Sequence, residues 1–429
     1  MRPKKSKDGG EQDLFRSRLD QIINMKHPLA RLCELVDWER LDNHFAPYYA
    51  DKGRSGLPIR LMVGLHLLKH IYALSDEDVC AQWEENPYFQ YFCGETFFQH
   101  RFPLERSSLT HFRNRIDPAA LDGVLQESLA IACEVGALKL KDLRKVAIDT
   151  TVQEKNVTYP TDHGLLRKAI HKLGAAARKV GIKLRQSYVR VAQKASIKVG
   201  RYLHANQKRR AKRELKFMRV RLGRLIRDVE RKIETITDEA SLRLQDSLRK
   251  ARHIWKQKRK DPDYLYSWHA PEVECIGKGK ARHPYEFGNK VSLATNLHTS
   301  GKAGKHFVLH VQALHGRPYD GHTLKRALDH IKQIVGRSPD RAVADDGYRG
   351  HKLNEPSTRI YLSKQKRGVT LEIKRDIKRR SVIEPIIGHI KNDGLMARNY
   401  LKGRKGDHLN AIFASIGFNF RQILSSMAT

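Results

Sequence analysis

Lys145-Val-Ala-Ile-Asp-Thr-Thr-Val152 is the stretch around which the fold is organised. Val146 to Ile148 are apolar, and β-branched residues follow the single acid Asp149, so the stretch predicts a buried β-strand. A carboxylate inside such a strand is costly to bury unless it has a partner or a metal ion. One explanation is an acid that bonds a neighbouring turn, and the other is a site completed by acids from elsewhere in the chain.

The chain carries a large surplus of positive charge. Its 429 residues include 82 Lys and Arg against 47 Asp and Glu, which gives a formal net charge of +35. Such a surplus destabilises a compact protein by self-repulsion unless a polyanion neutralises it. Nucleic acid is the first candidate partner, because bound phosphates release condensed counterions. An anionic membrane is disfavoured, since the chain has no apolar run of the length that spans a bilayer.

The cysteines and the N-terminus indicate a cytoplasmic protein. Five scattered cysteines form no C-x-x-C pair, which argues against a disulfide framework or a zinc knuckle. The first ten residues are basic but lack the apolar core of a signal peptide. We expect a disordered basic arm over 1–17 and a bacterial, cytoplasmic, nucleoid-associated location.

A helical domain is predicted over 18–140. The segment Leu57–His70 has apolar residues at helical spacing, and a later predicted helix projects Arg113 and Arg115. The positive charge of the chain favours DNA binding or dimerisation as the role of this domain. The spacing alone establishes no helix-turn-helix motif.

Most of the surplus charge lies in one segment. Residues 165–260 contain 31 Lys and Arg, 7 Asp and Glu and no proline. Apolar residues there recur in steps of three and four, which predicts a basic helical hairpin inserted over 163–262. So few acids leave the cations without i,i+4 partners, which favours contact with phosphates over a solvated face. The predicted DNA contacts are Lys208, Arg209, Arg210, Lys212 and Arg213.

β-strand patterns return after the insertion. Strands are predicted over Phe287–Asn296, Lys305–Leu314, Asp340–Asp345 and Arg359–Ser363, with helices between and after them. We therefore expect an α/β fold in which 141–162 and 263–429 form a mixed sheet with flanking helices.

Two further acids stand in contexts that match Asp149. Asp345 and Asp346 end a predicted strand, and the pattern does not separate them. Glu384 follows Arg380 by four residues on a predicted helix, where an ordinary surface ion pair is the simpler explanation. Three carboxylates at one sheet edge would repel each other unless cations lay between them. Oxygen ligands suit two Mg²⁺ or Mn²⁺ ions, which serve phosphoryl transfer on nucleic acids.

Taken in order, these residues resemble those of bacterial insertion-sequence transposases of the DDE class. The likeness covers nearly the whole chain and rests on Asn86–Gly94, Ile148–Thr151, Asp345–Tyr348 and the R-x3-E-x6-K pattern of Arg380, Glu384 and Lys391. It implies a ribonuclease-H-like catalytic domain with Asp149, Asp345 and Glu384 as catalytic metal ligands. It also implies that Arg380, Lys391 and Tyr348 contact DNA.

The chain departs from that family at two positions. Ile377 stands where the signature tyrosine is expected, and Pro385 lies inside the signature. The resemblance implies a transposase that cuts double-stranded DNA at the terminal inverted repeats of its own element and joins the 3′-hydroxyl ends to target DNA, as a homodimer. The alternatives are a relative that only binds DNA and a metal-dependent nuclease without strand joining.

Overall fold

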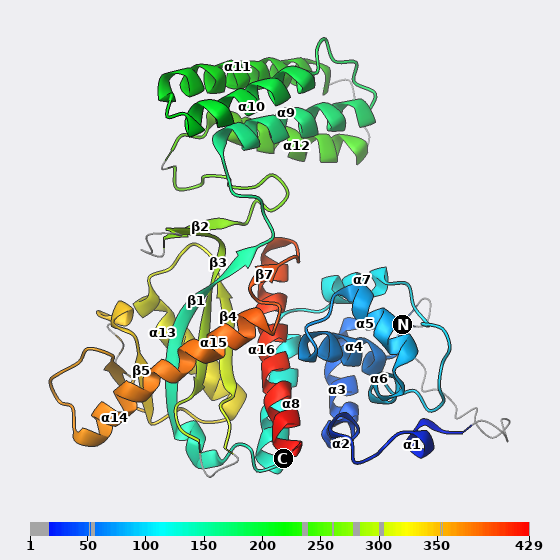
Figure 1. Cartoon of the computed structure of the whole chain (residues 1–429), viewed down its shortest axis with the longest axis vertical. Coiled ribbons are helices and arrows are strands. Elements are labelled where there is room, and N and C mark those ends of the chain that lie inside the picture. Colours follow the sequence, from blue (N-terminus) through cyan, green and yellow to red (C-terminus); the bar gives the residue numbers. More distant parts are fainter. Residues whose placement is uncertain are drawn as a thin grey trace. The chain divides into compact units, whose positions relative to one another are not determined.

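The computed structural model describes residues 17–50, 52, 56–233, 239–259, 261–277, 284–299, 304–351, 353 and 355–428. The chain forms two compact units (Figure 1). One unit comprises Met1–Glu154 and Asn289–Thr429, and the second comprises Lys155–Gly288. In the described residues, no helix combines the length and the apolar character needed to span a membrane. The predicted basic arm at 1–17 lies almost wholly outside the described residues.

The first unit begins with a set of short helices. Their bounds are α1 Leu19–Ile22, α2 Pro28–Leu35, α3 Trp38–Phe45, α4 Ile59–Ile71, α5 Asp76–Glu85, α6 Pro87–Phe92, α7 Ser107–Arg115 and α8 Ala120–Glu134. Local signals set several of their ends. Ser75, for example, accepts a hydrogen bond from Asp78 N–H and so caps α5.

The last helix, α16 (Gly403–Met427), joins this helical part to the sheet. It packs against α2, α4 and α8 on one side and against strand β4 on another (Figure 1). Gly417 lets α16 lie close to the backbone of α4, because a Cβ at this position would lie 2.5 Å from the carbonyl oxygen of His70. α4 and α16 are buried on most of their surface, so they form the core that links the two parts.

The sheet has strands β1 Lys145–Lys155, β2 Glu274–Gly277, β3 Tyr285–Asn296, β4 Val308–Leu314, β5 Arg341–Ala344, β6 Arg359–Leu362 and β7 Arg398–Asn399. The strand order is β2-β3-β1-β5-β6, while β4 pairs with β3 and β7 pairs with β1. β1, β5 and β6 are parallel, with Ile148 opposite Ala344 and Ala344 opposite Leu362. The β3–β4 and β2–β3 pairs are antiparallel.

Alternate residues of the parallel strands face different layers of helices. Ile148 and Ala344 belong to the main core, which includes α8, α13 (Asp320–Val335) and α16. Ala147 and Val343 belong to a smaller core with Ile383. Ile383 begins α15, which runs to Asn392 and follows α14, Leu371–Arg379. The side of the sheet that carries Ala147 and Val343 is therefore covered by the α14–α15 segment.

The described residues of the second unit form four helices: α9 Asp162–Lys179, α10 Val189–His204, α11 Lys208–Ile233 and α12 Glu239–Lys256. Their apolar faces share one core, to which α11 contributes Met218, Leu222, Leu225 and Val229. The predicted two-helix hairpin was therefore wrong in its number of helices. Its apolar spacing was that of a helix packed against several neighbours, a pattern that a two-helix pair also produces.

The mixed sheet of parallel and antiparallel strands, with helices packed against it, confirms the expected α/β class.

Candidate active site

Two of the predicted acids lie side by side because of the strand register. Ile148 is paired with Ala344, so Asp149 and Asp345 are the next residues along the parallel strands β1 and β5. Each acid is two residues beyond a member of the smaller core, Ala147 or Val343. Side chains two apart on a strand share a face of the sheet. The two carboxylates therefore lie on the face that the α14–α15 segment covers.

Glu384 comes from that helical segment. A 3₁₀ turn, Arg380–Val382, joins α14 to α15, which begins at Ile383. Pro385 is then the third residue of α15, where its missing N–H belongs to the first turn and costs no hydrogen bond within the helix. The irregular position in the sequence pattern is thus compatible with a helix that starts beside Glu384.

Arg380 contacts all three acids. Its Nη1 donates to Asp149 Oδ2 at 3.0 Å, and its Nη2 donates to Glu384 Oε1 at 2.9 Å. The distance from Nη2 to Asp345 Oδ1 is 3.8 Å. The Arg380 side chain is 13% exposed, whereas those of Asp345 and Glu384 are 50% and 61% exposed. The arginine is therefore enclosed, and two of its acids face solvent.

The electrostatics of the cluster are set by one guanidinium among three carboxylates. Burial raises the pKa of Asp149, and the negative charges of Asp345 and Glu384 raise it further. The charge of Arg380 and the hydrogen bond from the Thr150 N–H, at 2.7 Å, act in the opposite direction. The pKa of Asp149 remains above its usual value, so the cluster would be stabilised by more positive charge.

Two supporting residues were not predicted from the sequence. Ser363 follows β6 directly and donates from Oγ to Asp345 Oδ1 at 3.0 Å. Asp320, in the first turn of α13, accepts hydrogen bonds from Thr150 Oγ1 at 3.0 Å and from Lys290 Nζ at 2.9 Å. Ser363 could have been found from the strand register, because it continues the row formed by Asp149 and Asp345. The sequence holds no comparable signal for Asp320.

Two predicted DNA contacts are buried, and these predictions were wrong. Tyr348 is 1% exposed, and burial raises its pKa well above the usual value. Arg113 is 6% exposed and donates to both carboxylate oxygens of Asp76, at 2.9 and 2.5 Å. A pattern of charged and aromatic residues on a helix does not reveal a buried partner 37 residues away, and this is why Arg113 was misassigned.

Of the remaining predicted DNA contacts, Arg380 is enclosed among the acids, with 13% of its side chain exposed, and the others are accessible. Arg115 is exposed, with its guanidinium 4.8 Å from the ring centre of Tyr49. Lys391 lies half-buried on α15, seven residues after Glu384. The other five are all exposed and lie in the first turns of α11, in the second unit: Lys208, Arg209, Arg210, Lys212 and Arg213.

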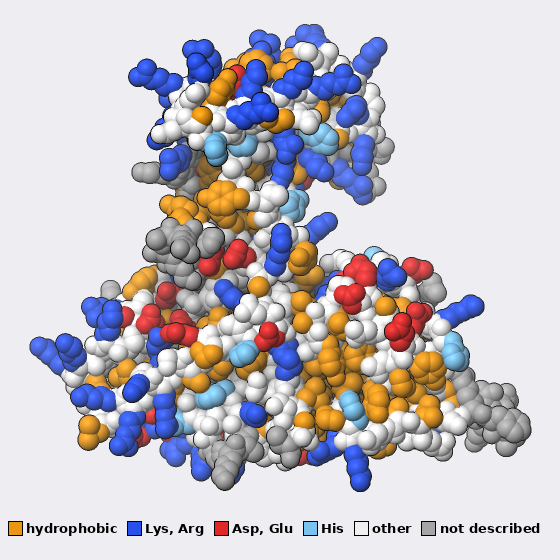
Figure 2. All heavy atoms as spheres, viewed as in Figure 1, with side chains coloured by type: hydrophobic (Ala, Val, Ile, Leu, Met, Phe, Trp, Pro, Cys, Tyr) orange, Lys and Arg blue, Asp and Glu red, His pale blue; other side chains and the backbone are white. Residues whose placement is uncertain are grey.

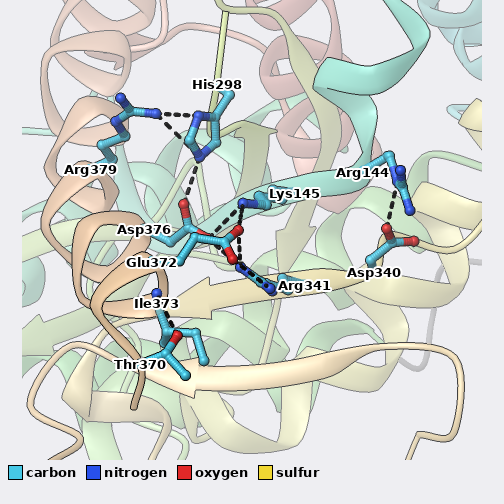
Figure 3. Close-up of polar contacts among 10 residues, drawn as sticks. All are labelled: Arg144, Lys145, His298, Asp340, Arg341, Thr370, Glu372, Ile373, Asp376 and Arg379. Atoms are coloured by element: carbon cyan, nitrogen blue, oxygen red, sulfur yellow. Dashed lines mark hydrogen bonds and ion pairs between the residues drawn. The ribbon is translucent and has the colours of Figure 1, made fainter.

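A separate ion-pair cluster holds α14 against the other end of the parallel strands (Figure 3). Asp376, 2% exposed, accepts from Lys145 Nζ at 3.0 Å, Arg341 Nη1 at 2.9 Å and His298 Nε2 at 2.7 Å. Burial alone would raise the pKa of Asp376, but these hydrogen bonds outweigh it and hold the pKa below its usual value. Asp376 precedes Arg380 by one helical turn, so this cluster fixes the segment that carries Arg380 and Glu384.

The acids suit a divalent metal ion in chemistry but are not arranged as a closed ligand set. Carboxylate oxygens are the ligands that Mg²⁺ and Mn²⁺ prefer. Among the described residues, no three His, Cys, Asp or Glu side chains are placed to hold one metal ion. The guanidinium of Arg380 takes the central position, so an ion could reach the three carboxylates only after this side chain had turned away.

Two comparisons with known proteins gave a match. Residues 17–115 match a family model described as "Transposase domain (DUF772)". The chain is also 46% identical over 207 residues to "Uncharacterized protein ORF8 in nfe locus" of Rhizobium meliloti. That alignment covers 48% of this chain and 100% of the relative. No solved structure matches the chain significantly.

Proposed function

The chain belongs to the family of this ORF8 protein and carries a transposase domain, and from that premise we propose that it is a DNA transposase of the DDE class. The proposed reaction cuts double-stranded DNA at the terminal inverted repeats of the chain's own element and joins the freed 3′-hydroxyls to target DNA. The observation that carries the proposal is the convergence of Asp149, Asp345 and Glu384 on Arg380. Asp149 lies within β1, Asp345 follows the neighbouring parallel strand β5, and Glu384 lies on a helix over the same face.

We propose a ribonuclease-H-like topology for the catalytic part. Three parallel strands lie beside antiparallel ones, and Asp149 within β1 and Asp345 directly after β5 both follow the last residue pair of the β1–β5 ladder, Ile148 and Ala344. In the proposed reaction, water attacks a phosphodiester and the 3′-hydroxyl of the element end leaves. This hydroxyl then attacks a phosphodiester of the target, and the 3′-hydroxyl of the cut target strand leaves. Two bound Mg²⁺ or Mn²⁺ ions would stabilise the attacking and leaving oxygens.

The residues around the acids have separate roles in this proposal. Asp149, Asp345 and Glu384 are the residues that would hold the metal ions. Arg380 keeps their carboxylates together in the free protein, and it would contact a DNA phosphate in the complex with DNA. Lys391 supplies a second cation on the same helix. The charge of +35 favours the approach of DNA to an acidic site that would otherwise repel it.

The test uses DNA that flanks the reading frame as the substrate. Glu384→Gln should abolish Mg²⁺-dependent strand cleavage and leave binding to the element ends unchanged, because the substitution removes one charge from a side chain that is 61% exposed. Arg379→Gln is the matched control, since Arg379 precedes Arg380 but contacts His298 rather than the acids. A Glu384→Gln protein that still cuts would contradict the proposal.

A relative that only binds DNA is the second candidate, because Arg380 already neutralises part of the cluster and no closed metal site is formed in the described chain. Absence of Mg²⁺- or Mn²⁺-dependent cleavage by the unaltered protein would favour it. A nuclease without strand joining is separated by supplying pre-cut element ends with plasmid DNA, since only a transposase yields joined product. We further propose a homodimer, because two element ends must be handled together, and a cytoplasmic location at the nucleoid.

A further inference from the structure

A hollow on the second unit is lined by cations and one indole. It has a volume of about 440 Å³ and lies between α11 and α12. The lining residues are Lys216, Arg219, Val220, Gly223, Arg227, Trp255 and Lys256. The lining therefore includes four cations and no acid. Figure 2 shows that many Lys and Arg side chains, and few Asp or Glu side chains, lie on the visible face of this unit.

The cations of the hollow have no acidic partners in the described part of the unit. Arg219 donates to the carbonyl oxygen of Gln257 at 3.3 Å, and no described acid forms an ion pair with any of the four. Lys216, Arg227 and Lys256 are exposed. Four unpaired like charges around one hollow repel each other unless an anion binds among them.

The indole of Trp255 is seated on α11 by a glycine. A Cβ on Gly223 would lie 2.8 Å from Trp255 Nε1 and 3.1 Å from Cε2. Glycine inside a helix is unfavourable, and here its small size lets the indole lie against the helix backbone. Trp255 is only half-buried, so part of its ring system lines the hollow.

A second, smaller hollow continues the basic surface along α11. Its lining includes Arg185, Tyr188, Arg224 and Arg231, and it shares Arg227 with the first hollow. Asp228 lies in this second hollow, 3.8 Å from the guanidinium nitrogens of Arg185 and Arg231, so the cations of this hollow are partly neutralised. The first hollow is therefore the stronger anion site, and the second extends the track past Arg227.

We propose that the hollow at Trp255 binds a nucleotide of an unpaired DNA strand. One base stacks on the indole, and the neighbouring phosphates contact Lys216, Arg227 and Lys256. An indole at the side of a hollow is accessible to a base that is not stacked within a duplex, and aromatic stacking with basic flanks is how proteins hold single strands. The choice of DNA rests on the proposed function. The test measures binding without cleavage, so either proposal can fail alone.

The test titrates the full-length protein with the oligonucleotide dT12 and follows tryptophan fluorescence and fluorescence anisotropy. We expect dT12 to quench the tryptophan fluorescence of the unaltered protein and not that of Trp255→Phe. Because phenylalanine keeps an aromatic ring, Trp255→Phe should retain most of the affinity for dT12. Trp255→Ala should raise the Kd by at least about fivefold. A dT12·dA12 duplex should quench less than dT12. Quenching that persists in Trp255→Phe, or equal quenching by the duplex, would overturn the proposal.

Charge variants keep the test independent of the fold around Trp255. The double variant Lys216→Ala/Lys256→Ala should reduce the slope of log K against log salt by about 1.4, because two single-strand phosphate contacts are lost. Lys198→Ala, an exposed cation on α10 outside both hollows, should leave the slope unchanged. Equal slopes for the double variant and the unaltered protein would overturn the phosphate contacts. Quenching by polyglutamate as strong as that by dT12 would assign the hollow to an acidic peptide instead.

Discussion

Asp376→Asn should loosen the helical segment that carries Arg380 and Glu384. Asp376 lies 2% exposed under three donors, from Lys145, Arg341 and His298 (Figure 3). The asparagine keeps the shape of the side chain but removes its charge. Its amide NH₂ group is a hydrogen-bond donor, so it cannot accept from the Lys145, Arg341 and His298 donors as the carboxylate oxygen does. The substitution therefore leaves cations without a buried counter-charge.

The expected loss is about 3 kcal/mol. Removing one partner of a buried ion pair costs about 3–5 kcal/mol. Two features place Asp376→Asn at the lower end of that range. The carbonyl oxygen of the asparagine still accepts one hydrogen bond, and Glu372 continues to accept from Lys145 and Arg341, at 2.7 Å each.

Amide hydrogen exchange of α14 measures this loss where it occurs. A reduction of about 3 kcal/mol in the free energy of opening should speed exchange by about 100-fold. Asp340→Asn is the control, because Asp340 pairs with Arg144 at the same end of the sheet but is 42% exposed. The control should lose less than about 1 kcal/mol. Equal exchange in the two variants would refute the view that the buried cluster anchors α14.

Three further outcomes follow from buried contacts in the first unit. Arg113→Ala should destabilise the protein by about 3 kcal/mol in urea unfolding, because Asp76 loses its bidentate partner. The control Arg115→Ala should cost less than about 1 kcal/mol. Equal costs for the two variants would contradict the burial of Arg113. Gly417→Ala should lower the unfolding midpoint by the equivalent of at least about 1–3 kcal/mol, since its Cβ would meet the His70 carbonyl oxygen at 2.5 Å, and an unchanged midpoint would be inconsistent with this helix contact. Burial raises the pKa of Asp76, but the hydrogen bonds from Arg113 and the charges of Arg113 and Lys69 outweigh burial and hold the pKa well below its usual range. The stability that this acid contributes is therefore fully present above its unfolded pKa of about 3.9. It is lost as the pH falls below that value toward the folded pKa. Urea midpoints from pH 6 to pH 2 should fall less steeply in Asp76→Asn than in the unaltered protein.

Local patterns predicted the part of the fold that depends on neighbours in sequence. The apolar run before Asp149 gave a buried strand, and the strand predicted up to Asp345 is β5. The predicted helix that carries Glu384 is α15, which begins at Ile383. Each of these follows from propensity and side-chain periodicity, which act within a few residues.

Contacts between distant residues were less accessible to sequence reasoning. The choice between Asp345 and Asp346 depended on a family resemblance until the register placed Asp345 beside Asp149. Asp346 instead pairs with Arg349 at 2.9 Å. Tyr348 was expected at the DNA, yet it is buried. A residue type does not reveal whether its side chain faces solvent or core when the strand that precedes it ends in a turn.

We propose that Asp149, Asp345 and Glu384 act as one catalytic cluster. The most direct measurement compares Mg²⁺-dependent cleavage of flanking-element DNA by Asp345→Asn and by Asp346→Asn. The two acids are adjacent and carry the same charge, but Asp345 lies 3.8 Å from Arg380 whereas Asp346 pairs with Arg349. We predict that Asp345→Asn abolishes cleavage and that Asp346→Asn retains it. Equal activity in the two variants, or the reverse order, would contradict the account.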